Sequence, residues 1–268
     1  MGKFDGYLFC TDLDGTLLNS SHQISRDNKE AIAYFKSEGG LFTFITGRPY
    51  IISREMYEAV CPNAPIGCFN GGGIYDFEKG EYLWHNSLPE SAVEVLDFVY
   101  DNIPDVGIQL SLPHRIVYTR DNSSMRYFRD ITDTPYIYGH YREVDEPIVK
   151  VVFGHLDPVR LSEIRALVES QPFASKYDFI TAAADFYELL PRGNSKGALL
   201  TKMAELLGLD MSKTVAVGDF ENDVSMIKAA GIGYAVANAK DCAKAAADRV
   251  TVSNDEHAIA AIIAELGE

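Results

Sequence analysis

Residues 7–20 read YLFCTDLDGTLLNS. Five mostly apolar residues are followed by two aspartates, Asp12 and Asp14, only two positions apart. Two such carboxylates repel each other by about 4 kcal/mol at ~4 Å separation and an effective dielectric constant of ~20. We therefore expect either a positive group between them or a proton on one of them.

The chain around this stretch alternates between expected strands and helices. Strands are predicted at 7–11, 41–46 and 66–70, and amphipathic segments lie between them. The first of these segments has Ser25 as its candidate N-cap, and Gly39 follows its end. The alternation returns late in the chain, where the strand TVAVGD at 214–219 lies between two expected helices. This order predicts an α/β domain with a parallel sheet covered by helices.

The middle of the chain has a different pattern. A hairpin is expected at 73–84, and the strands and helices that follow do not alternate simply. We therefore expect an α/β core formed by residues 1–85 and 188–268 and split by an inserted α+β domain, residues 86–187.

Composition limits the classes of function. The chain has 268 residues, a net charge of −15 and an isoelectric point of about 4.8, which argues against binding to nucleic acid or to an anionic membrane surface. No apolar run approaches the ~18 residues of a membrane span, and no leader is expected. The four cysteines form no CxxC pair, so reduced cysteines in a cytoplasmic protein are the expectation.

Four polar residues stand at the carboxyl ends of expected strands: Asp12, Thr46, Asn70 and Asp219. Ligands of open parallel sheets bind outside the carboxyl ends of the strands, so these side chains are expected to converge on one crevice. Each also has an ordinary explanation, for example turn chemistry at Asp14-Gly15 or an acidic helix N-terminus at 218–223. Taken together, the convergence favours a functional site.

Six motifs occur in order along the chain: DLDGTLL (12–18), TGRP (46–49), NGG (70–72), SKG (195–197), GDFEND (218–223) and VANA (236–239). By these motifs the chain resembles phosphatases of the haloacid dehalogenase superfamily, and more narrowly the Cof-like group. The resemblance implies a Rossmann-like parallel core and makes the insert a cap domain that selects the substrate. It also implies hydrolysis of a phosphate monoester of a small metabolite.

The resemblance assigns roles residue by residue. Asp12 would be the nucleophile that forms an aspartyl-phosphate, and Asp14 the general acid and base. Mg²⁺ would be held by Asp12, by Asp14 through its carbonyl, and by Asp219, with Asp223 as a further contact. The residues expected to bind the phosphoryl group are Leu13, Thr46, Gly47, Lys196 and Asn222. Arg48 and Asn70 are candidates for contacts with the substrate.

Other functions fit parts of the pattern. A phosphomutase would use the same aspartyl-phosphate, and a receiver-type signalling module also combines acids, a Thr and a Lys on a parallel sheet. The insert and the second acidic motif favour the phosphatase over the receiver, and a non-catalytic binder fits least. The substrate is left open among sugar phosphates, cofactor phosphates and nucleotides. A monomer and a small homo-oligomer are both compatible with the sequence.

Overall fold

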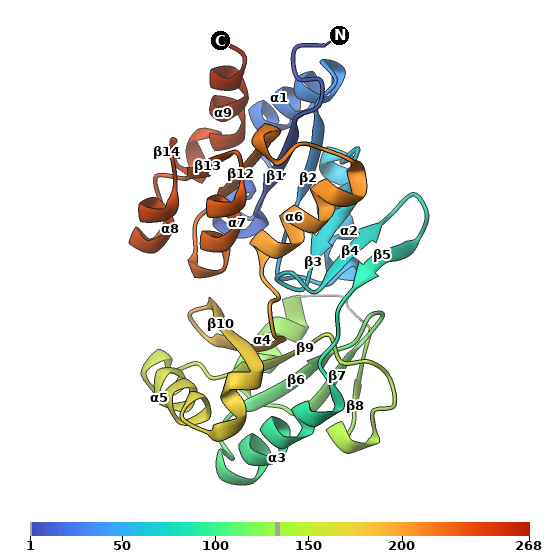
Figure 1. Ribbon diagram of the computed structural model, residues 1–268. Helices are drawn as coiled ribbons and strands as arrows, with labels where there is room; N and C mark the ends of the chain where they lie inside the picture. The colour runs from blue at the N-terminus through green and yellow to red at the C-terminus, as the bar shows by residue number, and fades with distance from the viewer. Residues whose placement is uncertain (1, 132–134) are drawn as a thin grey trace. The chain divides into compact units, whose positions relative to one another are not determined.

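The computed structural model of the protein describes residues 2–131 and 135–268 and divides into two compact units (Figure 1). The first unit consists of Met1–Trp84 and Ser195–Glu268, and the second of His85–Asn194. Each unit has its own sheet and its own buried apolar cluster.

The second unit ends later than the insert expected from the sequence, at residue 194 rather than 187. The reason is strand β11 (Phe186–Pro191), which pairs antiparallel with β9 (Lys150–Gly154) and β10 (Tyr177–Ala183). Because all of β11 is hydrogen-bonded into that sheet, the chain returns to the first unit only after the strand has ended.

The first unit is built on a five-stranded sheet in the order β14-β13-β12-β1-β2. All neighbouring strands are parallel, and Cys10 at the centre is aligned with Thr43 on one side and Ala216 on the other. The strands are β1 (Leu8–Thr11), β2 (Leu41–Phe44), β12 (Thr214–Gly218), β13 (Ile232–Ala235) and β14 (Arg249–Val250). The predicted parallel α/β sheet is confirmed.

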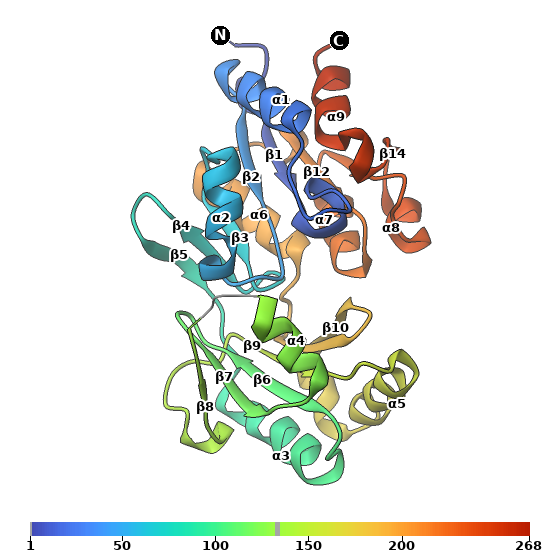
Figure 2. The ribbon, with the colours of Figure 1, turned by 180° about the vertical axis from the view of Figure 1, so that it is seen from behind.

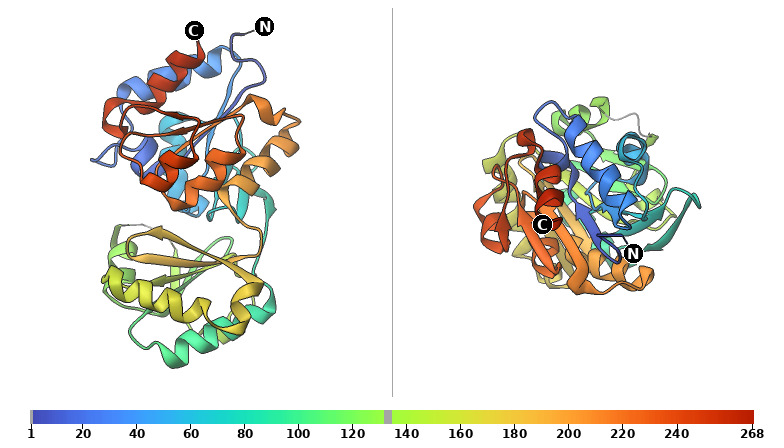
Figure 3. Two further views of the ribbon diagram at one scale, coloured as in Figure 1. Left: turned by 60° about the vertical axis from the view of Figure 1, so that its left-hand side comes forward. Right: turned by 90° about the horizontal axis from the view of Figure 1, so that it is seen from above.

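Helices cover both faces of this sheet. Helices α6 and α7 pack together on one face, whereas α1 and α9, from near the two ends of the chain, pack together on the other (Figures 1, 2 and 3). The helices are α1 (Arg26–Ser37), α2 (Tyr50–Val60), α6 (Lys196–Leu207), α7 (Val224–Ala229), α8 (Asp241–Ala246) and α9 (Ala258–Leu266). Ser25 caps α1 by accepting a hydrogen bond from the Asn28 amide, as its position before the apolar pattern predicts.

The third expected strand of the core joins a different sheet. Strand β3 (Ile66–Cys68) pairs antiparallel with β4 (Gly73–Asp76), which continues into β5 (Glu81–His85). A single parallel bridge between Ile45 and Gly67 connects β3 to the end of β2. The sequence therefore predicted the strand but not its partner, because the β3–β4 hairpin provides more backbone hydrogen bonds than one bridge.

The second unit contains a six-stranded sheet in the order β10-β11-β9-β6-β7-β8. Its neighbours are antiparallel except for β7 and β8, which are parallel. The remaining strands are β6 (Gly107–Ser111), β7 (Ile116–Arg120) and β8 (Tyr136–Tyr138). The predicted α+β composition of the insert is present.

Helices of the second unit bury one face of this sheet. Val99 of α3 (Val93–Asn102) and Ile164 of α5 (Pro158–Glu169) belong to the same fully buried cluster as Leu110 and Val151 of the sheet. A third helix, α4, spans Ser123–Ile131. Over the described parts of the two units, every helix is too short or too polar to cross a bilayer.

Candidate active site

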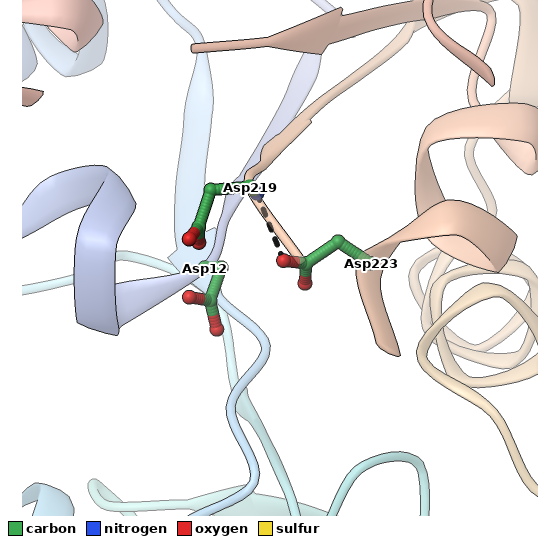
Figure 4. A group of neighbouring side chains, drawn as sticks. All are labelled: Asp12, Asp219 and Asp223. Carbon is green, nitrogen blue, oxygen red and sulfur yellow. Dashed lines mark hydrogen bonds between the residues drawn. The ribbon is translucent and has the colours of Figure 1, made fainter. Parts of the chain in front are cut away.

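Three aspartates meet beyond the carboxyl ends of two neighbouring strands. Asp12 follows β1 and Asp219 follows β12, and the parallel pairing of Thr11 with Val217 brings these two positions to the same edge. Asp223 stands one short turn further along the chain. One carboxylate oxygen from each lies within 4.8 Å of the others, and the side chains point toward one another (Figure 4).

Lys196 is the positive group beside Asp12, and its second partner is Asp223, not Asp14. Its ammonium group donates to Asp12 Oδ1 at 2.5 Å and to Asp223 Oδ1 at 2.6 Å, and its side chain is fully buried. The residue occupies the first position of α6, whose N-cap Ser195 accepts a hydrogen bond from the Ala198 amide. A lysine at this end of a helix opposes the helix dipole, and the two carboxylates compensate for that cost.

The SKG motif also has a packing reason. A Cβ atom on Gly197 would lie 2.3 Å from the carbonyl oxygen of Ser225 at the start of α7. Only glycine lets the two helices approach this closely, and the approach brings Lys196 to Asp223.

Asp223 has both carboxylate oxygens engaged. Oδ2 accepts hydrogen bonds from the amides of Asp219 and Phe220, each at 3.0 Å, while Oδ1 accepts from Lys196. The side chain therefore fixes the loop that carries Asp219 as well as the lysine that faces Asp12. Asp219 is held from its other side by Thr16, whose hydroxyl donates to Asp219 Oδ1 at 3.0 Å.

Burial and mutual repulsion shift the proton affinities of this cluster. Burial, with the nearby charges of Asp223 and Asp219, raises the pKa of Asp12 well above its ordinary value, although Lys196 opposes the shift. Burial and the Asp223 charge raise the pKa of Asp219 to about 6. Burial alone would lower the pKa of Lys196, but the charges of Asp12 and Asp223 raise it above the ordinary lysine value, so it stays protonated.

The cluster has the composition of a site for a hard divalent cation. Three carboxylates face a single ammonium group, which leaves an excess negative charge when all are ionised. Oxygen donors of this kind are the ligands that Mg²⁺ prefers in proteins. Burial, with the repulsion between the acids, raises the pKa values of Asp12 and Asp219, and a bound cation would favour their ionised forms. The residues present fit a Mg²⁺ ion.

Asp14 is oriented differently from Asp12. Its carboxylate pairs with Arg48, with Arg48 Nε 2.9 Å from Asp14 Oδ2 and a terminal guanidinium nitrogen 2.5 Å from Oδ1. Half of the Asp14 side chain is exposed, and it does not belong to the group of three converging acids. The Asp14 carboxylate therefore faces Arg48 rather than the three converging acids.

The structure places the remaining predicted residues on the four segments that follow β1, β2, β3 and β12. Thr46 is buried after β2, and its hydroxyl accepts a hydrogen bond from the Arg48 amide at 3.2 Å. Asn222 donates to Asn70 Oδ1 at 3.0 Å. Leu13 has a buried side chain in the turn Leu13–Leu17, directly after Asp12. Gly47 packs against the amide of Asn70.

Thr16 and Gly15 are residues of this site that the sequence analysis did not single out. A Cβ atom on Gly15, whose φ is +78°, would lie 2.6 Å from Asp219 Oδ2. Asn238 donates to the Gly15 carbonyl at 2.8 Å and so supports the same turn. The signal in the sequence was the DGT that follows Asp12, but its partner is about 200 residues away, and only the fold brings Asp219 to it.

Comparison with known proteins identifies the family. Residues 9–263 match the family of haloacid dehalogenase-like hydrolases, and the chain belongs to it. The putative phosphatase YxeH of Bacillus subtilis is 31% identical over 97% of both chains. The 5-amino-6-(5-phospho-D-ribitylamino)uracil phosphatase YitU of the same organism is 28% identical, again over 97% of both chains.

A solved structure of a haloacid dehalogenase-like hydrolase has a similar fold over nearly the whole chain. The haloacid dehalogenase-like hydrolase from Bacteroides thetaiotaomicron has 27% identity and a TM-score of 0.84, covering 97% of this chain and 99% of that one. The chain is therefore a phosphoric monoester hydrolase with the fold of that family, as the motifs predicted.

Proposed function

We propose that the protein is a Mg²⁺-dependent phosphatase of a small phosphorylated metabolite that works through an aspartyl-phosphate on Asp12. The observation that carries this proposal is the buried contact of Lys196 with Asp12, beside Asp219 and Asp223. A nucleophilic carboxylate has to be ionised, yet burial raises the pKa of Asp12. The protonated lysine and a bound cation together would keep Asp12 ionised.

The cation would be held by the carboxylates of Asp12 and Asp219 and the backbone carbonyl of Asp14. Asp223, whose oxygens already accept from Lys196 and two amides, would act beside these ligands. When bound, Mg²⁺ supplies charge neutralisation for the phosphoryl oxygens and the approaching carboxylate.

In the proposed first step, an Asp12 carboxylate oxygen forms a bond to phosphorus while the bond from phosphorus to the ester oxygen breaks. Asp14 gives its proton to the departing oxygen. In the second step a water molecule attacks the phosphoryl group, Asp14 accepts its proton, and the bond between phosphorus and Asp12 breaks. The products are an alcohol, inorganic phosphate and the original enzyme.

Asp14 needs a partner that controls its orientation, because it must face the leaving oxygen. Arg48 holds the Asp14 carboxylate with two hydrogen bonds. We assign to Arg48 the orientation of Asp14 and contact with the leaving-group side of the substrate.

The phosphoryl oxygens would be bound by the residues that surround Asp12. Their donors include the ammonium group of Lys196, the hydroxyl of Thr46 and the amide side chain of Asn222, together with the backbone amides of Leu13 and Gly47. Fixed donors of this kind stabilise the charge that develops during phosphoryl transfer.

The second unit would act as the cap that selects the substrate's organic group. Closure of such a cap keeps bulk water away during formation of the phosphoenzyme. YitU, one of the similar proteins, is named for a phosphorylated ribitylamino compound, which supports a small polyol phosphate or cofactor-like phosphate as the substrate class.

The test is phosphate release from a panel of sugar phosphates, nucleotides, pyridoxal phosphate and flavin mononucleotide, with Mg²⁺ and with EDTA. Asp12→Asn should abolish turnover, and Asp27→Asn, at an exposed position on α1, should leave it unchanged. Rapid quenching of the wild type should recover a phosphoryl group on the peptide that contains Asp12. Turnover by Asp12→Asn at the wild-type rate would refute the proposal. A phosphorylated isomer in place of free phosphate would identify a mutase instead.

A further inference from the structure

The turn that contains Asn70 has an unusual backbone. Phe69, Asn70 and Gly71 follow β3 with φ values of 57°, 55° and 112°, so three consecutive residues lie in the left-handed region. Asparagine tolerates this region better than most residues, but phenylalanine does not. Both side chains are fully buried. Such a conformation persists only where the surrounding structure imposes it, and it is concentrated at functional sites.

The first connection of this turn is to the loop after β2. The Asn70 amide donates to the Thr46 carbonyl at 3.0 Å, and the Phe69 amide donates to the Arg48 carbonyl at 3.3 Å. A Cβ atom on Gly47 would lie only 2.8 Å from Asn70 Nδ2, so the side-chain amide of Asn70 packs directly on the Gly47 backbone. The glycine of the TGRP motif is thus required by Asn70.

The second connection is to the loop after β12. Asn70 Oδ1 accepts a hydrogen bond from Asn222 Nδ2 at 3.0 Å, although the two residues are 152 positions apart. Asn222 Oδ1 is a buried acceptor without a hydrogen-bond partner among the described residues. The contact with Asn70 is therefore the hydrogen bond by which the Asn222 side chain is oriented.

We infer that Asn70 is a positioning residue that fixes the distance between the Gly47 amide and the Asn222 side chain and does not itself contact the substrate. The two groups on either side of it belong to the proposed phosphoryl-binding set, so this inference rests on the proposed function. The Asn70 side chain touches both of them. Its side-chain oxygen accepts from Asn222, and its side-chain nitrogen lies against the Gly47 backbone.

This assignment differs from a substrate contact in its kinetic consequence. Loss of a substrate contact weakens binding of the ground state and raises KM. Loss of a positioning residue displaces donors that act on the transition state, so it lowers kcat. A displaced supporting group typically costs about 10–100-fold.

The test uses Asn70→Gly, which keeps the left-handed backbone and removes the side-chain amide. We expect kcat to fall about 10–100-fold while KM and the half-saturating Mg²⁺ concentration change less than about threefold. His22→Gly is the matched control, because His22 is also a left-handed non-glycine residue but lies at an exposed turn. Asn70→Asp, which retains an acceptor for Asn222, should recover part of the lost kcat.

A double-mutant cycle tests whether Asn70 acts through Asn222. If Asn70 acts through Asn222, Asn70→Gly combined with Asn222→Ala should be no slower than the worse single variant. Additive losses, or an increase in KM that accounts for the whole effect, would overturn the inference.

A binding measurement keeps this test independent of the proposed function. Orthovanadate, added with Mg²⁺, should raise the melting temperature of the wild type more than that of Asn70→Gly, whereas Mg²⁺ alone should stabilise both equally. Equal vanadate responses would refute the positioning role. Absence of phosphatase activity in the wild type, with the difference in vanadate response retained, would refute the proposed function only.

Discussion

The ammonium nitrogen of Lys196 lies 2.5 Å from Asp12 Oδ1, although the two residues are 184 positions apart in the chain. The contact joins the first strand of the core to the first turn of a helix that follows the inserted unit. It provides a positive group beside Asp12, whereas Asp14, the other aspartate of the initial pair, is held by Arg48. It also couples stability to the proposed catalysis, because the same buried ion pairs connect distant segments of the core and favour the ionised form of Asp12.

Lys196→Met should therefore affect both properties. Removing one partner of a buried ion pair leaves uncompensated carboxylates and typically costs about 3–5 kcal/mol of unfolding free energy. Loss of a preorganised donor should lower kcat by about 100–1000-fold. Urea denaturation and steady-state kinetics would measure the two effects.

The control for this variant is Lys202→Met, on the same helix, where the lysine forms a partly exposed pair with Glu205. It should change the free energy of unfolding by less than about 0.5 kcal/mol and leave activity intact. If Lys196→Met and Lys202→Met behaved alike, the assigned role of Lys196 would be wrong.

Substitution of Arg48 should lower activity with little loss of stability, whereas Lys196→Met should lower both. Its pair with Asp14 is partly exposed, with half of the Asp14 side chain accessible, so Arg48→Ala should cost no more than about 1 kcal/mol of stability. The proposed orientation of Asp14 depends on two hydrogen bonds from a planar guanidinium group, which lysine cannot provide. We expect Arg48→Ala and Arg48→Lys both to lower kcat by about tenfold or more.

The comparison for Arg48 is Arg26→Ala, which breaks an exposed pair with Glu30. Thermal unfolding and phosphate-release kinetics on the three variants would separate the two roles. Full activity in Arg48→Lys would show that charge alone suffices and that the geometry of the pair is unimportant.

The local elements of the core were predictable because their signals are local. Ser25 caps α1 as its position predicted, and Gly208, with a φ of +66°, is the C-cap of α6. Parallel pairing followed from the alternation of strands and helices. The convergence of Asp12 and Asp219 then followed from the rule that parallel strands end at a common edge.

What the sequence did not reveal depends on contacts between distant residues. β3 pairs mainly with β4 because the hairpin with β4 gives it more backbone hydrogen bonds than the single bridge to the end of β2. Asp223 Oδ2 accepts hydrogen bonds from the amides of Asp219 and Phe220 only because the backbone at those two residues directs both amides toward it. The end of the inserted unit depends on β11, whose sequence gives no indication of the sheet it joins.

Alanine substitutions at Gly15 and at Gly80 separate the steric effect of a Cβ atom from the cost of a left-handed backbone. Gly15 and Gly80 both have left-handed φ values, +78° and +72°, so an alanine at either position pays a similar backbone cost of about 1 kcal/mol. A Cβ atom at Gly15 would meet Asp219 Oδ2 at 2.6 Å, whereas one at Gly80 would meet nothing within 4 Å. Gly15→Ala should displace Asp219 and weaken Mg²⁺-dependent turnover, so that more Mg²⁺ is needed for activity, and Gly80→Ala should behave like the wild type.

Measurement of the Mg²⁺ concentration that gives half-maximal activity would test this pair. An increase confined to Gly15→Ala would connect the turn to the metal ligand. Equal behaviour of the two variants would mean that Asp219 moves aside without consequence.

The raised pKa of Asp219 predicts how stability depends on pH without metal. Its folded pKa of about 6 exceeds the ordinary value of 3.8, so between those values the folded protein holds more protons than the unfolded chain. The unfolding free energy should therefore fall as pH rises through this window, with a contribution from Asp219 on the order of 3 kcal/mol. Asp12, whose pKa burial also raises, adds to the same trend.

Bound Mg²⁺ should reverse this loss, because it favours the ionised carboxylates. We expect Mg²⁺ to raise the melting temperature more at about pH 7.5 than at about pH 5, and Asp219→Asn to flatten the pH dependence measured in EDTA. Asp27→Asn, at an exposed position on α1, controls for the general effect of removing one negative charge from a chain of net charge −15. An equal response to Mg²⁺ at both pH values would place the metal away from the Asp12–Asp219 pair.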